Sequence, residues 1–495
     1  MASFLDILKK NKEKIYFVVF SLIFALVVWF ATKSVNLFLF AVPLVVIFGY
    51  FSLVDYKWLW YLTVFLMPLS ITESEFFGKL AGVTFPTDFL AIMLLGLLLF
   101  KLASERNWKL PFGSHPIPII IGLQVLWMIF AAVPSSMPIV SWKYITAYVW
   151  LLGGFFFLPL LLFREKKVMF RFFQLIVVSF TMAFVIIMTL YVGSGRNPFG
   201  LRFNPGPFFV DHTVFGAFTS MWVPVLVLLS FAGELKRRER LLARFGLIVF
   251  ITALFFSYSR GAWASCVASL LLMGVILMGK WARKFLLPTM MLGMLAGLFV
   301  WYANQSAPVK NNSVSRKNLS EHIASVTNFR TDDSNRERIN RWYCAWEMFK
   351  DRPMFGFGPG TYSFQYGNFQ KSRTRTYVST NRGDNGTAHN EFLLALSESG
   401  WPGPIILIFL FAVPFLRALR GYNRASKRNT RLLYLACAMG LMAYDIHAFV
   451  NNFLDQDKVG GTYLVLLAII TALDIYYLPK EKGLPQESVK MVRAV

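Results

Sequence analysis

Charge and cysteine are both scarce in this sequence. Only 15% of its 495 residues are charged, and cysteine occurs three times, at Cys266, Cys344 and Cys437. So few cysteines exclude a disulfide framework, and their spacing matches no metal-binding motif. The low charge excludes an ordinary soluble protein, in which about 25% of the residues are charged.

Most of the sequence is instead apolar. Hydrophobic residues make up 56% of the chain and aromatic residues 17%. Windows of roughly 17 to 25 mostly apolar residues recur along it, long enough to cross a hydrocarbon layer about 30 Å thick. Backbone polar groups in lipid must be satisfied within their own segment, so we predict helices. The predicted fold is an all-α integral membrane protein with about 14 transmembrane helices. The predicted spans are 15–32, 35–53, 57–71, 88–103, 117–133, 141–163, 168–192, 214–232, 242–257, 261–279, 285–303, 404–418, 431–451 and 461–478.

The net charge of +24 raises nucleic acid as a partner, but the positions of the cations argue against it. If the amino terminus is cytoplasmic, the inside segments hold 29 Lys and Arg and the short outside loops hold seven. This excess follows the positive-inside rule. It predicts a multi-pass membrane protein with both termini in the cytoplasm and no nucleic-acid partner. The first apolar run is longer than that of a signal peptide, so we expect a retained helix.

One long segment, 304–403, separates a transmembrane bundle (1–303) from the last three spans and a cytoplasmic tail (404–495), and the charge alternation places it outside. Its apolar residues recur at helical spacing, which predicts an amphipathic helix at 335–350. The aromatic face of this helix suits either the lipid headgroup boundary or packing on the bundle. The aromatic and apolar residues of this face are Ile339, Trp342, Tyr343, Trp346 and Phe349.

Ionisable and polar residues gather at the outside ends of several spans, where they are costly and therefore default functional candidates. These residues are Arg202, Asp211, His212, Arg260, His389, Asp445, His447, Asn451 and Asn452. Arginine binds diphosphate oxygens bidentately, and an imidazole can take a proton from an attacking hydroxyl. The alternatives are structural: Arg260 as an interface anchor, and Asp445 and His447 as packing pairs. The three outside histidines lack ligand spacing, so we expect no metal and no other cofactor.

These residues lie in motifs that resemble the bacterial O-antigen ligase and O-antigen polymerase superfamily. The motifs are Ser259-Arg260-Gly261, the run from Pro353 to Tyr362 (PMFGFGPGTY), and His389-Asn390 followed by nine residues and Gly400. The resemblance implies a metal-independent, GT-C-like glycosyltransferase of lipopolysaccharide biosynthesis, which takes a glycan from undecaprenyl diphosphate in the periplasm. It also implies that His389 is the catalytic base or orients the acceptor, and that Arg202 and Arg260 bind the donor diphosphate.

Several alternatives remain open at this stage. The acceptor is either lipid A core, as in a ligase, or another lipid-linked glycan, as in a repeat-unit polymerase; we favour the ligase. A flippase or transporter for the same lipid-linked sugar is a third hypothesis, but we find no internal repeat of the kind transporters show. Glu398 is a rival base, although a helix over 389–400 would place it on the face opposite His389. We expect Asn390, Glu398, His212, Asp445 and His447 to support the site.

Overall fold

The computed structural model describes residues 56–73, 83–104, 113–195, 203–233, 235–279, 284, 333–370 and 386–478. Three predicted spans, 15–32, 35–53 and 285–303, lie outside the described residues, and each of the other eleven overlaps a helix. The helices are α4 (Tyr56–Leu66), η2 (Met67–Leu69), α5 (Thr87–Ser104), α6 (Pro116–Ala132), α7 (Pro138–Leu152), η3 (Gly153–Phe157), α8 (Leu158–Leu162), α9 (Lys166–Gly193), α10 (His212–Ser230), α11 (Arg237–Phe256), α12 (Arg260–Leu277), α15 (Asp333–Asp351), α16 (Tyr362–Gln365), η5 (Tyr366–Phe369), α17 (Glu391–Ser399), α18 (Pro402–Arg424), α19 (Arg428–His447) and α20 (Asp457–Tyr476).

Six helical segments of the described part are long and apolar enough to cross a membrane; one of them joins α7, η3 and α8 over Pro138–Leu162. Several helices also turn large apolar side chains away from the protein, among them Leu123 and Phe130 on α6 and Val185 on α9. Extended apolar faces of this kind are disfavoured in water and expected in lipid. The chain is therefore a multi-pass membrane protein built of α-helices, as its sequence predicts.

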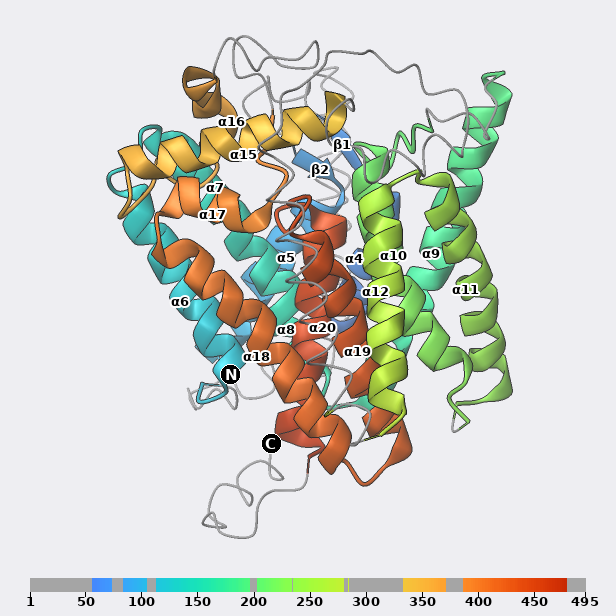
Figure 1. Cartoon of the computed structure of the whole chain (residues 1–495). Helices are drawn as coiled ribbons and strands as arrows, with labels where there is room; N and C mark the ends of the chain where they lie inside the picture. Colours follow the sequence, from blue (N-terminus) through green and yellow to red (C-terminus); the bar gives the residue numbers. More distant parts are fainter. Residues whose placement is uncertain are drawn as a thin grey trace, which may run out of the picture.

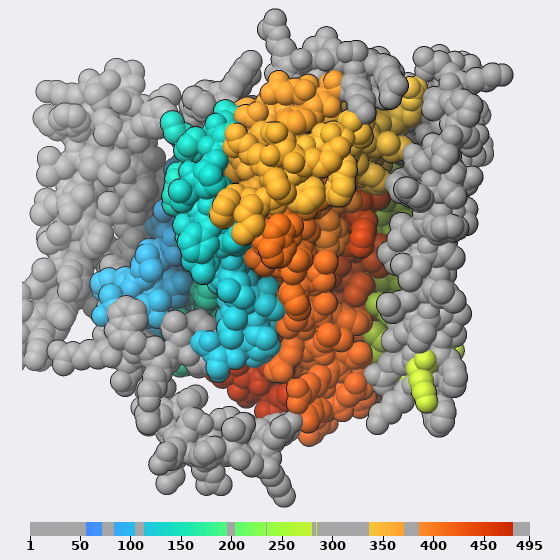
Figure 2. Space-filling view, turned by 60° about the vertical axis from the view of Figure 1, so that its left-hand side comes forward, coloured from blue at the N-terminus to red at the C-terminus, as the bar shows by residue number. Residues whose placement is uncertain are grey.

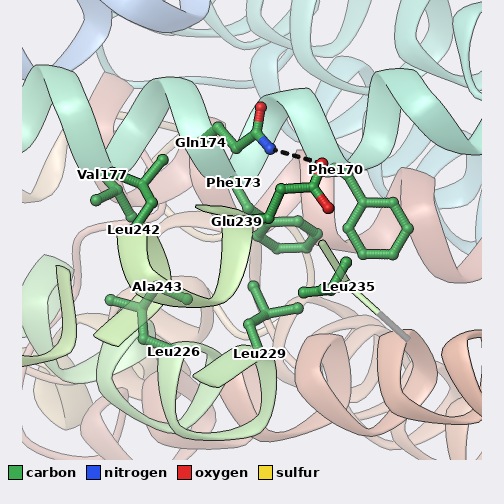
Figure 3. A pocket seen from close by; sticks show the side chains of 10 residues that line it. All are labelled: Phe170, Phe173, Gln174, Val177, Leu226, Leu229, Leu235, Glu239, Leu242 and Ala243. Atoms are coloured by element: carbon green, nitrogen blue, oxygen red, sulfur yellow. Dashed lines mark hydrogen bonds between the residues drawn. The ribbon is translucent and has the colours of Figure 1, made fainter. Parts of the chain in front are cut away.

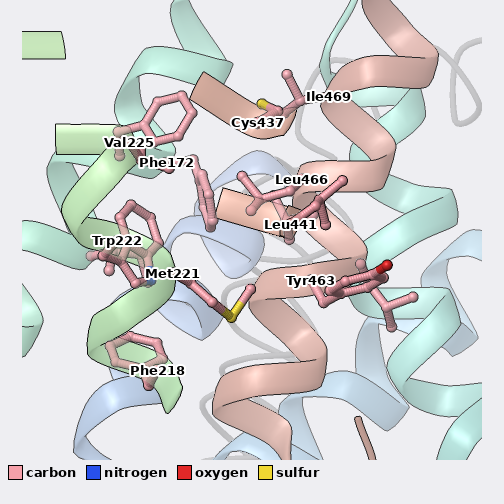
Figure 4. Packing of buried hydrophobic residues seen from close by; sticks show 14 of the residues in the cluster. Phe172, Phe218, Met221, Trp222, Val225, Cys437, Leu441, Tyr463, Leu466 and Ile469 are labelled. Atoms are coloured by element: carbon pink, nitrogen blue, oxygen red, sulfur yellow. The ribbon is translucent and has the colours of Figure 1, made fainter. Parts of the chain in front are cut away.

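The centre of the bundle is formed by α10, α19 and α20, which run side by side (Figure 1). Their facing side chains, including Trp222, Met221, Leu441 and Tyr463, are almost completely buried in one apolar core (Figure 4). By contrast, α12 and α18 bury a much smaller share of their surface and lie at the periphery. The most rigidly packed helices are thus those whose ends carry the polar residues discussed below.

Glycines let the central helices approach closely. A Cβ atom at Gly216 of α10 would lie 2.8 Å from Cβ of Ser259, and one at Gly440 of α19 would lie 3.2 Å from the carbonyl oxygen of Met221. The second contact holds α19 against α10, and the first holds the beginnings of α10 and α12 together at one end of the bundle. We call this end of the bundle the site end, and the end where α18 finishes and α19 begins the opposite end (Figure 1).

Two local features differ from the sequence-based expectation. A short antiparallel ribbon joins β1 (Ile71–Glu73) to β2 (Val83–Phe85) at the site end. In addition, α19 ends at His447, four residues before the predicted boundary, so Asn451 and Asn452 lie in the following loop. The loop replaces the helix there because Glu391 accepts hydrogen bonds from the backbone N–H groups of Phe453 and Leu454.

A cover of helices and loops lies across the site end. Its main element, α15, crosses the ends of the spanning helices, and residues 333–370 lie over α6, α7, α17 and α18 (Figures 1 and 2). A helix was predicted here at 335–350, but it buries another face than its aromatic one. Trp346 is exposed, whereas Arg341, Cys344 and Met348 are buried. The buried face packs on η5 and on α17, and it places the cation of Arg341 in the interior of the cover.

Candidate functional site

The segment containing His389 is built around the short helix α17. Asn390 caps its first turn, because the side-chain Oδ1 accepts a hydrogen bond from the N–H of Leu393 at 2.9 Å. Gly400 ends it with a φ of 69°, and a Cβ atom there would lie 2.1 Å from the carbonyl oxygen of Met354. The spacing of the motif therefore has a structural reason: a capping asparagine, a nine-residue helix and a glycine that no other residue can replace without strain.

His389 lies immediately before this helix, in the left-handed backbone region with a φ of 50°. Its Nε2 is 3.1 Å from Nη1 of Arg341, and its Nδ1 is 3.1 Å from Oδ1 of Asn451. Nδ2 of Asn451 is 2.9 Å from Nε2 of His447. The imidazole thus bonds to α15 of the cover on one side and to the loop that follows α19 on the other.

The donors in this chain fix the tautomer of each imidazole. A guanidinium can only donate, so Nε2 of His389 accepts and its proton resides on Nδ1, which donates to Oδ1 of Asn451. The amide nitrogen of Asn451 then donates to Nε2 of His447. His389 is neutral in this arrangement, because a protonated Nε2 would point its hydrogen at another donor.

Electrostatics act in the same direction. Burial, followed by the nearby positive charges of Arg338 and Arg341, lowers the pKa of His389 to about 3; the hydrogen bond to Asn451 and the charge of Asp211 oppose the shift. Asp211 contributes from the start of α10, where its carboxylate caps the N–H groups of Thr213 and Val214. His389 is therefore an imidazole that binds a proton weakly in the state without substrate.

The start of α12, which contains the arginine motif, contacts the same cluster. Arg260 is the first residue of α12, and the position of Gly261 faces His447: a Cβ atom there would lie 3.3 Å from Cε1 of the imidazole. A side chain at this position would have to displace its neighbours by a few tenths of an ångström, so glycine favours the close approach of α12 to His447. Parts of the chain far apart in sequence thus meet at the site end: the start of α12, Arg341 of α15, His389 and the loop that follows α19.

Glu398 takes no part in this hydrogen-bonded chain. Its two carboxylate oxygens accept hydrogen bonds from the N–H groups of Gly360 and Tyr362, both at 2.9 Å. The carboxylate fixes the glycine-rich loop, in which Gly356, Gly358 and Gly360 all have positive φ. This geometry favours a structural role for Glu398, and it explains why the PMFGFGPGTY run and the histidine motif occur together.

Behind α17 lies a cavity of about 80 Å³ that Glu391 and Glu398 line together with Tyr144, Tyr148 and Gln124. It has room for several water molecules but not for a sugar chain. A second hollow, between α9, α10 and α11, is smaller and mostly apolar; a hydrogen bond between Gln174 and Glu239 crosses it (Figure 3). Neither of these two cavities is large enough to hold a lipid-linked glycan.

The remaining predicted site residues are placed as follows. Arg202 lies outside the described residues. His212 is exposed at the start of α10. Asp445 accepts a hydrogen bond from the hydroxyl of Tyr463 at 2.9 Å and so links α19 to α20, which is the packing alternative considered above. Asn390 caps α17 and also donates to the carbonyl oxygen of Phe449.

Sequence reasoning missed Arg341, which contacts Nε2 of His389 at 3.1 Å. Arg341 also donates from Nε to Glu337 at 3.0 Å and from Nη1 to the carbonyl oxygen of Thr387 at 3.1 Å. A signal for it was present: Glu337 and Arg341 are four residues apart on one face of the predicted helix, which is the spacing of an ion pair. The more prominent aromatic face concealed this one.

These observations define a class of protein: a multi-pass helical membrane protein with an arginine- and histidine-containing site beneath a cover at one end. Residues 245–408 match the family model described as O-antigen ligase. The match includes Arg260, Arg341 and His389 and confirms the resemblance to the O-antigen ligase and polymerase superfamily, whose members are membrane enzymes of the glycosyltransferase type. No curated protein matches the sequence significantly.

Proposed function

We propose that this protein transfers a glycan from undecaprenyl diphosphate to an acceptor hydroxyl at the periplasmic face of the bacterial inner membrane, with lipid A core as the acceptor. The observation that carries the proposal is the position of His389 between Arg341 and Asn451, within the region that matches the O-antigen ligase family. The proposal includes a GT-C-like architecture and a reaction that needs no metal.

The proposed reaction assigns each group a chemical task. The oxygen of the acceptor hydroxyl attacks the anomeric carbon of the donor sugar, and the bond from that carbon to the diphosphate oxygen breaks. Nε2 of His389 takes the hydroxyl proton, and the electron pair of the broken bond leaves with the diphosphate. Arg260 and Arg202 neutralise the charge that develops on the leaving group, since guanidinium binds phosphate oxygens bidentately. The proton then passes from the imidazole to solvent.

Substitution of His389 tests the proposal. In membranes reconstituted with an undecaprenyl-diphosphate-linked glycan and an acceptor, we expect His389→Ala to lower the transfer rate by about 10²- to 10⁴-fold, the usual contribution of a general base. His115→Ala is the matched control, because His115 caps α6 at the opposite end. It should retain turnover per folded molecule. Undiminished transfer by His389→Ala would remove this residue from catalysis, and absence of donor-dependent transfer by the unaltered protein would refute the proposed function.

The acceptor is resolved by the surface polysaccharide of a deletion strain, separated on a gel. Loss of all capped lipid A core indicates a ligase. Survival of core capped with a single repeat indicates the repeat-unit polymerase, which would use the same donor chemistry with a second lipid-linked glycan as acceptor. An unchanged polysaccharide pattern would contradict both assignments.

A further inference from the structure

We infer that Arg341 is a positioning residue that controls His389: its guanidinium occupies the basic nitrogen of the imidazole until the diphosphate of the donor takes the guanidinium over. This inference rests on the proposed function, because it requires an anionic donor. It deepens that function by explaining how the base is kept inactive when no donor is bound. Water is then not activated at an empty site.

The first argument is the occupation of both ring nitrogens. Nδ1 of His389 donates to Asn451, and Nε2 accepts from Arg341. A base needs a lone pair, and the only lone pair of a neutral imidazole in this tautomer is on Nε2. The acceptor hydroxyl can therefore be deprotonated only after the N–H of Arg341 has left that position.

The second argument is that Arg341 can release His389 without losing its own position. Its Nε is held by Glu337 and its Nη1 by the carbonyl oxygen of Thr387, and the guanidinium lies 5.6 Å from the ring centre of Tyr366. Within the described part of the chain, none of the hydrogen bonds of Arg341 uses Nη2. Only the bond to His389 has to be exchanged, and Nη2 carries two N–H groups that these bonds do not use.

The third argument is the relative strength of the two partners. The bond between Arg341 and His389 joins a cation to a neutral acceptor through a single N–H. A diphosphate offers several charged oxygens, and guanidinium binds two of them at once with stronger, charge-assisted hydrogen bonds. The donor is therefore the better partner and displaces the imidazole.

The charged and titratable groups facing His389 come from three elements. Arg338 and Arg341 contribute two positive charges from α15, and Asp211 contributes a negative charge from the start of α10. His447 reaches it through Asn451 from the end of α19. When the diphosphate binds, its negative charge offsets the two guanidinium groups, so the pKa of His389 rises from about 3 towards its usual range. The base becomes stronger when the donor arrives.

Chemical labelling tests the inference without requiring activity. Diethyl pyrocarbonate acylates the unprotonated imidazole nitrogen, and mass spectrometry measures the labelling rate of His389 in the full-length protein at pH 7. We expect Arg341→Met to label about tenfold faster than the unaltered protein, which corresponds to the loss of one charge-assisted hydrogen bond. Arg338→Met is the matched control: it removes a charge one helical turn away and should leave the labelling slow.

Glu337→Gln/Arg341→Met protects this test against misfolding. Glu337 is buried, so Arg341→Met alone leaves a carboxylate without its ion-pair partner, whereas the double variant removes both charges. Fast labelling in the double variant supports the inference. Labelling no faster than in Arg338→Met overturns it, because Arg341 would then not cover Nε2.

The pH dependence of transfer provides the second readout, because kcat/KM reports the free enzyme and kcat the complex with the donor. His389 works unprotonated. With its pKa near 3 in the free enzyme, kcat/KM should stay level between about pH 5 and 8; with the pKa raised in the complex, kcat should fall below about pH 6. In Arg341→Met, the loss of one of the two nearby positive charges should move the acid limb of kcat/KM to higher pH than in the unaltered protein. If kcat and kcat/KM of the unaltered protein show the same acid limb, the inference is overturned and the proposed function stands. If the unaltered protein shows no transfer, both the function and the inference are refuted.

Discussion

Each end of the helix bundle contains a hydrogen-bonded cluster with a histidine, and the two clusters are built in opposite ways. At the opposite end, the carboxylate of Asp474 accepts from His115, Arg417 and Tyr434 at 3.0, 2.8 and 2.7 Å. At the site end, His389 contacts a guanidinium and an amide, and among the described residues no carboxylate bonds to it. His115 is thus bonded to the anion of Asp474, whereas His389 is bonded to the cation of Arg341.

This difference separates a structural cluster from a chemical one. Nδ1 of His115 accepts from the N–H of Ile117 and its Nε2 donates to Asp474, so both nitrogens of the imidazole are used to fix α6 against α20. The positive charge of Arg417 in this cluster is already neutralised by Asp474. At the site end, Arg341 is shared with an imidazole that an anionic ligand can displace. Glu337 pairs with Arg341 through Nε alone, so the Nη1 that contacts His389 can exchange the imidazole for an anionic substrate.

The largest expected effect comes from removing the anion at the opposite end. Asp474→Ala leaves Arg417, His115 and Tyr434 without their common acceptor, and breaking a buried pair in this way costs about 3 kcal/mol or more. Thermal unfolding in detergent should show a lower Tm, while turnover per folded molecule stays the same. An unchanged Tm would mean that the two clusters do not differ as described.

A smaller effect is expected from placing a carboxylate beside the histidine of the site end, as Asp474 lies beside His115 at the opposite end. Asn451→Asp places a carboxylate beside His389, and an opposite charge at this distance raises the pKa of an imidazole by about 1 to 3 units. Because the base works unprotonated, the acid limb of kcat moves to higher pH. We expect kcat at pH 7 to fall by about tenfold and to recover above about pH 8.5. A loss that is equal at both pH values would indicate a structural defect instead.

The sequence was sufficient for the membrane architecture, because the physical signal is strong and local. An apolar run of about 20 residues, such as 214–232, has few alternatives to a helix in lipid. The positions of the polar residues at span ends followed from the same pattern, and His389, His447 and Asn451 do meet in the structure.

The composition of the site could not be derived as fully, because it depends on which face of a short helix is buried. Periodicity identified an aromatic face of α15 and left open whether it meets lipid headgroups or the bundle, but it gave no indication that another face, which contains Arg341, is buried against Glu337 and Thr387. Local hydrophobicity cannot reveal this choice, since the partners lie 46 residues or more away in the case of Thr387 and His389. The role of Glu398 was hidden for the same reason: its partners are the N–H groups of a loop 36 and 38 residues earlier.

The smallest effect is expected from a substitution of Asp445, which tests whether this residue of the site end belongs with His389 or with the packing of the bundle. Asp445 lies two residues before His447 but bonds only to the hydroxyl of Tyr463 among the contacts that the described residues show. Asp445→Asn retains an oxygen that can accept this hydrogen bond, so we expect stability to change by less than about 1 kcal/mol. Transfer should stay within about twofold of the unaltered protein, because the substitution leaves the hydrogen bonds from Arg341 through His389 to His447 in place. A large loss of transfer at unchanged Tm would extend the chemical cluster to α20, and Asp445 would then have to be counted with His389 rather than with the packing of the bundle.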